Sequence, residues 1–163
     1  MRKSLWAVAV CLAVFAFAGD SFAGNYWDNW TKGKAQGPMP DCGVNVLPLG
    51  GDQILQDTVD IYCGVKPGSY KSWINPKVMK IYKRKGKHYP DGKTGVLVFK
   101  TIGVVFTTDH KDGQPIYDVL TIADEKSVAS SEPNHPLNPN TCKVCHETHG
   151  GTCKGFVCGN RLL

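Results

Sequence analysis

The chain has 163 residues, of which 42% are hydrophobic and 20% charged, and its formal net charge is +5. This length suits one domain with a modest core, and the composition is that of a folded chain rather than a disordered one. So mild a basic excess gives no indication of nucleic-acid binding, and either a solvated surface or weak docking to an acidic partner protein explains it.

The N-terminus has the pattern of a secretory signal peptide. Residues 1–3 are Met-Arg-Lys, residues 5–18 are almost all apolar, and small residues lead up to Ala23. The apolar run is shorter than the roughly 20 residues of a membrane-spanning helix, which disfavours the alternative of an anchor. We therefore expect residues 1–23 to be removed and residues 24–163 to be exported, in bacteria to the periplasm, without a membrane span.

The exported part reads as a single domain of mainly β structure. Residues 24–51 are rich in Gly, Pro, Asn and Trp and predict an irregular N-terminal arm. Apolar or β-branched runs of strand length follow at residues 57–63, 78–82, 96–108 (interrupted at Gly103) and 116–123. Pro67 opens a predicted helical turn that ends at Trp73. Tight turns at residues 89–92 and 109–113 predict an antiparallel sheet with a few short helices.

A Pro-, Ser- and Asn-rich loop, residues 127–140, leads into the motif CKVCH at residues 142–146. In a CxxCH motif the two sulfurs add to the two vinyl groups of a haem, and the histidine binds the iron. A zinc site or a redox-active disulfide is the competing interpretation. We expect one covalent haem c, attached through Cys142 and Cys145, with His146 as the proximal iron ligand.

The sixth iron position separates an electron carrier from a site for small ligands. Met39 and Met79 are the methionines of the exported part, and neither fits the usual position of a carrier's ligand. The other histidines stand in polar, turn-like surroundings that are typical of the surface: His88, His110, His135 and His149.

Four cysteines of the exported part lie outside the motif: Cys42, Cys63, Cys153 and Cys158. An even number in an oxidising compartment suggests two disulfides, and Cys153 and Cys158 are close enough in sequence to close a small loop. Cys42 with Cys63 would then tie the N-terminal arm to the first strand. In the alternative, Cys42 or Cys63 binds the iron as a thiolate and lowers its reduction potential.

Three segments resemble the cytochrome P-460 and cytochrome c′-β family: residues 62–73, the turn at residues 89–92 that leads into residues 96–100, and the late CxxCH motif. The resemblance implies a small exported monohaem protein on a mostly antiparallel sheet, a dimer, and an iron that can be five-coordinate. Some members oxidise hydroxylamine, and others bind nitric oxide or carbon monoxide.

The resemblance also identifies Lys100 with the lysine that is cross-linked to the haem edge in the enzymes of this family. An outward-facing lysine on a half-exposed strand is the alternative. The chain departs from the enzymes in the longer interval before Lys100, in Thr101 where an acidic residue is common, and in the distal acid, for which Asp109 is the nearest candidate. The extra cysteines resemble those of the small His/Cys-ligated cytochromes of this fold, which form heterodimers.

We therefore expect a periplasmic monohaem c-type cytochrome that binds small diatomic ligands or transfers electrons at low potential to a redox partner protein. A homodimer and a heterodimer both fit this expectation. A hydroxylamine-oxidising enzyme with a lysine–haem cross-link is the alternative, and a plain electron carrier is a third reading.

Overall fold

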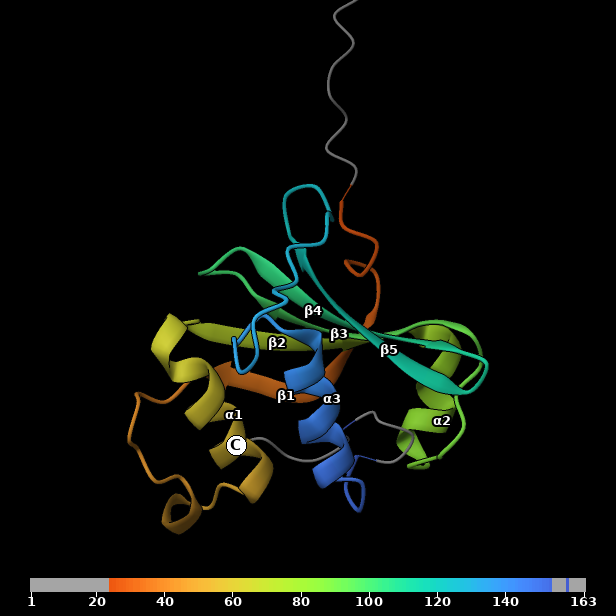
Figure 1. The fold of residues 1–163 in the computed structure, drawn as a ribbon. Helices are drawn as coiled ribbons and strands as arrows, with labels where there is room; N and C mark the ends of the chain where they lie inside the picture. Colours follow the sequence, from red (N-terminus) through yellow and green to blue (C-terminus); the bar gives the residue numbers. More distant parts are fainter. Residues whose placement is uncertain (1–23, 154–157, 159–163) are drawn as a thin grey trace, which may run out of the picture.

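The computed structural model describes residues 24–153 and 158, and its centre is one five-stranded antiparallel sheet in the order β1-β2-β3-β4-β5 (Figure 1). The predicted signal peptide lies outside the described residues. The strands are β1 (Thr31–Pro38), β2 (Ser69–Ile74), β3 (Gly92–Phe99), β4 (Val104–Lys111) and β5 (Gln114–Thr121). The helices are α1 (Gln53–Tyr62), α2 (Met79–Lys83) and α3 (Pro139–Thr148), with short 3-10 turns at Leu47–Leu49, Cys63–Val65 and Pro76–Val78.

The expected mainly β fold, an antiparallel sheet with a few short helices, is confirmed. Its best-predicted part is the meander from β3 to β5, where strands adjacent in sequence pair directly. Gly103 has a φ of 69° in the β3–β4 turn, and Asp112 and Gly113 have φ values of 51° and 74° in the β4–β5 turn. These left-handed conformations favour Gly and Asp, which is why the turn signals were correct.

The prediction of a strand at residues 57–63 was wrong, because this segment belongs to helix α1. The Asp52 side chain caps the helix by accepting a hydrogen bond from the Leu55 N–H at 3.0 Å. The buried residues of the helix are Ile54, Leu55, Val59 and Tyr62, a spacing that puts them on one side of a helix. The β-branched residues of this segment suggested a strand, but in the helix Leu55 and Val59 pack against Val46 of the arm, while Tyr62 packs against the sheet.

The predictions for the next two segments, a helical turn from Pro67 to Trp73 and a strand at residues 78–82, were both wrong. Residues 69–74 form strand β2 instead of a helical turn, and Tyr70 and Ile74 are its buried positions. Residues 76–83 are helical instead of extended, because Asn75 caps the turn and Pro76 occupies its first position. Pro76 stands at the start of a helical segment, as proline often does, whereas Pro67 precedes a strand.

The arm at residues 24–51 is only partly irregular, because it contains the edge strand β1. This strand pairs with β2, and the register shifts between Lys32 and Gln36. Gly33 lies in the shifted part, where a Cβ would collide with the Ser72 hydroxyl. The glycine is therefore needed for the close approach of β1 to β2.

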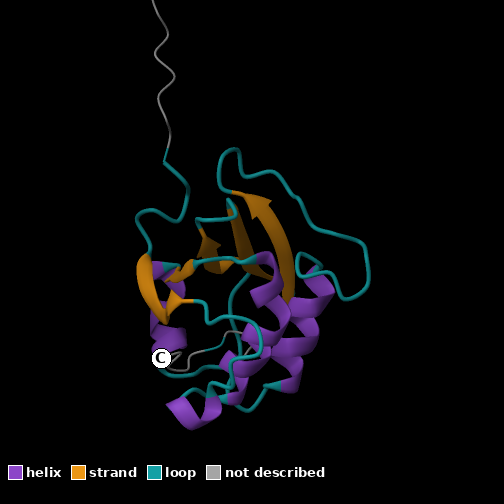
Figure 2. Ribbon diagram, turned by 90° about the vertical axis from the view of Figure 1, so that its left-hand side faces the viewer, coloured by secondary structure: helices purple, strands orange, loops and turns teal. Residues whose placement is uncertain are grey.

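Different segments of the chain pack on the two faces of the sheet. Trp27 of the N-terminal arm packs on one face against Val96, Val98 and Val105. The other face contributes Tyr70, Phe99, Phe106 and Val119 to a cluster completed by Tyr62 of α1. In the side view of Figure 2 the longer helices lie beside the strand layer. None of the helices in the described part of the chain has the length and apolarity that crossing a membrane requires.

Asp109 on β4 provides a test of the electrostatics of this fold. Burial raises the pKa of its carboxyl, Lys93 and His110 partly offset the rise, and its Oδ1 is buried without a hydrogen-bond partner among the described residues. A carboxyl whose pKa is higher in the folded than in the unfolded chain favours folding most when protonated, so its contribution declines as the pH rises through the folded pKa.

We expect Asp109→Asn to increase the free energy of unfolding at pH ~7 by up to about 1 kcal/mol, because it removes a poorly solvated charge. Near pH ~3.5 the gain should shrink, because the carboxyl of the parent protein is then largely protonated. Urea unfolding at both pH values measures the difference. An equal or larger gain at the lower pH would contradict this account.

Candidate functional site

Helix α3 presents the CxxCH residues on one face. Asn138 caps the helix by accepting from the Asn140 N–H, and Pro139 occupies its first turn. Cys142, Cys145 and His146 follow at positions i, i+3 and i+4, which are neighbours on a helix surface. The helix thus directs both sulfurs and the imidazole toward α1 and the sheet.

The three side chains meet a cavity between α1, α3 and the sheet, here called the central cavity, with a volume of about 150 Å³ and an open mouth. Small-molecule and cofactor sites are lined mostly by apolar side chains with a few polar groups. The wall opposite α3 includes Ala35, Ile74, Leu97 and Phe106. The mostly apolar lining of this cavity suits a hydrophobic cofactor.

The imidazole of His146 is oriented by strand β5. The Tyr117 hydroxyl lies 3.2 Å from His146 Nδ1, and the two rings meet edge to face with centroids 5.1 Å apart. Burial raises the pKa of the Tyr117 phenol, so the phenol is neutral at physiological pH. When Nδ1 is protonated it donates to this oxygen, and Nε2 then carries the lone pair that a metal needs.

The motif cysteines are half-buried thiols. Cys142 Sγ lies 3.7 Å from the Tyr62 hydroxyl, and burial raises the pKa of both groups. Burial also raises the pKa of the Cys145 thiol to about 11. A redox-active or zinc-binding cysteine normally has a lowered thiol pKa. Among the described residues there is also no group of three or more His, Cys, Asp or Glu side chains placed to hold a metal ion. A haem iron, by contrast, needs a single protein ligand.

The four remaining cysteines are paired as Cys42–Cys63 and Cys153–Cys158. This pairing corrects the alternative in which Cys42 or Cys63 binds the iron, because a disulfide sulfur is not a thiolate. Cys158 lines the central cavity. Cys42 and Cys63 lie at a different depression, beside Met39.

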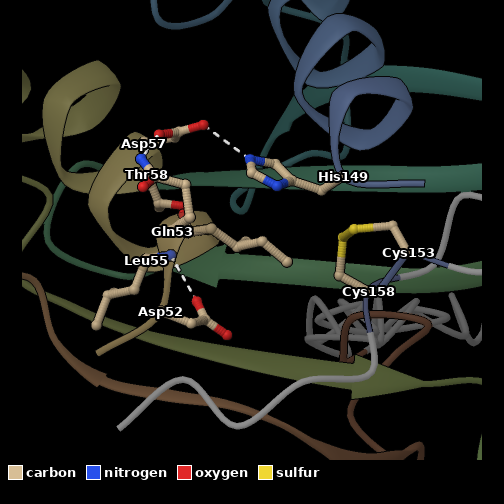
Figure 3. Close-up of polar contacts among 9 residues, drawn as sticks. Asp52, Gln53, Leu55, Asp57, Thr58, His149, Cys153 and Cys158 are labelled. Atoms are coloured by element: carbon tan, nitrogen blue, oxygen red, sulfur yellow. Dashed lines mark hydrogen bonds and ion pairs between the residues drawn. A yellow bond between two sulfur atoms is a disulfide. The ribbon is translucent and has the colours of Figure 1, made fainter. Parts of the chain in front are cut away.

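A polar contact between α1 and α3 closes one end of the site. His149, the residue that caps α3, places Nε2 at 2.7 Å from Asp57 Oδ2 (Figure 3). In the same view Asp52 caps α1 through the Leu55 N–H, so the helix that presents Asp57 is itself anchored. His149 is therefore a linking residue and not a free surface histidine.

Several predicted site residues lie away from the central cavity. Lys100 is exposed in the β3–β4 turn, and Asp109 and Met79 also lie outside the described lining. His110 is buried, contrary to the expectation of a surface histidine, and its Nδ1 lies 2.7 Å from Thr94 Oγ1 while its ring stacks on Tyr89.

Sequence reasoning missed Tyr117, Asp57 and Ser72 as parts of the site. Tyr117 and Ser72 reach it through strand pairing, which joins residues far apart in the chain. Asp57 was placed on a strand, which concealed its helical position facing α3. Comparison of the chain with protein-family models, with curated proteins and with solved structures found no match.

Replacing Asp57 by Asn should lower the free energy of unfolding by about 1–2 kcal/mol, because the hydrogen bond from His149 loses its charged acceptor. Urea unfolding monitored by circular dichroism measures the loss. Asp60→Asn is the matched control, since among the described residues the Asp60 carboxylate accepts a hydrogen bond from Gln56 alone, in an exposed contact on the same helix. Equal losses in the two variants would contradict a specific link between α1 and α3.

Proposed function

We propose that this protein is an exported monohaem c-type cytochrome that binds small diatomic molecules, such as nitric oxide and carbon monoxide. Cys142 and Cys145 would carry the covalent haem, and His146 would be the proximal iron ligand. The observation that carries the proposal is the convergence of these three side chains, from one helix face, on a mostly apolar cavity.

The cavity wall argues for an open sixth position. Among the described lining residues, His146 is the single histidine, and none is a methionine. Residues 154–157 and 159–163 contain no histidine, methionine or cysteine. The lining sulfurs are those of the motif and of the Cys153–Cys158 disulfide. An iron held only by His146 supplies a coordination site for a diatomic ligand, and the apolar wall keeps water away from it.

The proposal includes membership of the cytochrome P-460 and cytochrome c′-β family. The antiparallel sheet and the late CxxCH helix agree with what the resemblance implies about the fold. The hydroxylamine-oxidising alternative has less support, because Lys100 and Asp109 lie away from the cavity. Electron transfer to a partner protein is the second candidate, because Cys142 and Cys145 are only half-buried and would bring the haem edge near the surface.

The first test is covalent haem attachment. When the protein is exported by a cell that attaches haem c, we expect its mass to exceed that of the processed polypeptide by one haem. Cys142→Ala combined with Cys145→Ala should abolish the added mass, because both thioether bonds are lost. Cys153→Ala combined with Cys158→Ala is the matched control and should retain it. A parent protein with the mass of the bare polypeptide would overturn the proposal.

The second test concerns the hydrogen bond to His146. Tyr117→Phe keeps the ring but removes the oxygen 3.2 Å from Nδ1. Because an acceptor at the outer nitrogen makes the imidazole a stronger donor to the metal, the variant should show a lower iron–imidazole stretching frequency and a higher reduction potential. Resonance Raman spectroscopy and potentiometry measure these quantities. Unchanged values in a fully haem-loaded variant would show that Tyr117 does not tune the imidazole.

A further inference from the structure

Ser72 lines the central cavity, and its hydroxyl makes no hydrogen bond with the described residues. Ser72 lies on β2, where its cross-strand neighbour is Leu97. Its Oγ is buried and has no hydrogen-bond partner among the described residues. An unsatisfied buried hydroxyl destabilises a fold, so its presence calls for a partner that occupies the cavity.

A second hydroxyl in the same wall shows the usual solution. Thr58 on α1 also lines the cavity, but its Oγ1 donates to the Ile54 carbonyl at 2.6 Å. The two hydroxyls therefore differ in one respect that matters for binding. The Thr58 hydroxyl donates its proton within α1, whereas the Ser72 hydroxyl has no hydrogen-bond acceptor among the described residues.

The edge strand makes room for this serine. A Cβ at Gly33 would collide with the Ser72 hydroxyl, although Gly33 does not adopt a backbone conformation reserved for glycine. Ala35, the next residue of β1 in the cavity wall, is also small. The residues beside β2 thus accommodate the hydroxyl without supplying an acceptor.

The surroundings would strengthen any hydrogen bond that Ser72 makes. Ile74, Leu97 and Phe106 line the same wall, and a hydrogen bond in such apolar surroundings is stronger than one in water. A small ligand that enters this cavity would also meet the hydroxyl side chains of Tyr70, Thr107 and Thr108. The hydroxyls of Tyr62 and Tyr117 contact Cys142 Sγ and His146 Nδ1. The charge on its outer atom would then decide how much it gains from Ser72.

We propose that Ser72 is a specificity-determining residue of this cavity, donating a hydrogen bond to the outer atom of a bound diatomic ligand. The inference rests on the proposed function. It names the favoured ligand class as molecules whose outer atom becomes negatively charged on binding iron, such as nitric oxide or dioxygen. Carbon monoxide gains less, because its outer atom stays nearly neutral.

The test uses the full haem-loaded protein and compares Ser72→Ala with Ser69→Ala, because Ser69 is an exposed serine of the same strand that does not line the cavity. Ser72→Ala should weaken nitric oxide binding about five-fold, as the loss of one hydrogen bond predicts, and should shift the infrared C–O stretch of the carbon monoxide complex to higher wavenumber. The urea midpoint of the ligand-free, haem-loaded variant should not fall, because the substitution removes an unsatisfied hydroxyl. Ser69→Ala should leave both the affinity and the stretch unchanged.

The following results distinguish a failure of the Ser72 inference from a failure of the proposed function on which it rests. A haem-loaded Ser72→Ala protein with unchanged nitric oxide affinity and unchanged C–O stretch would overturn the role of Ser72 alone. Equal effects in Ser69→Ala would do the same, because they would show that the change does not depend on a hydroxyl in the cavity wall. A chain that carries no haem would overturn the proposed function and this inference together.

Discussion

The site depends on how one face of α3 is fixed against α1 and β5. Cys142 meets Tyr62 of α1, His146 meets Tyr117 of β5, and His149 binds Asp57 of α1. The contacts begin at the fourth residue of a ten-residue helix and end at its cap, so they limit both its rotation and its tilt. The same constraint holds the two sulfurs and the imidazole at the mouth of the central cavity.

The cavity exists because the sheet is sealed on one side and left partly open on the other. Trp27 and its neighbours fill the far face, while small residues of β1 and the spacing of the two helices leave space on the near face. The Cys42–Cys63 disulfide joins the arm to the end of α1 and closes a loop of 21 residues. A loop of this length corresponds to about 3 kcal/mol of stabilisation, because the cross-link lowers the conformational entropy of the unfolded chain.

Turn residues predicted the part of the fold in which strands adjacent in sequence also pair in the sheet. The turn signal at residues 109–113 and the interruption at Gly103 indicated the β3–β5 meander, whereas the helix α3 that carries the motif was not predicted. The same reasoning failed for α1, where β-branched residues outweighed the Asp52 cap, and for β1, whose pairing with β2 shows no alternating apolar pattern. Tyr117 and Ser72 could not be assigned, because only sheet pairing brings them to a motif that is distant in sequence.

The central claim is that His146 alone among the cavity residues would hold the iron, with an open position opposite. The most direct test is the absorption spectrum of the reduced protein, produced in a cell that attaches haem c, before and after carbon monoxide is added. The account predicts a five-coordinate high-spin spectrum that changes to that of a six-coordinate complex. A low-spin six-coordinate spectrum that carbon monoxide leaves unchanged would contradict it, as would a colourless protein.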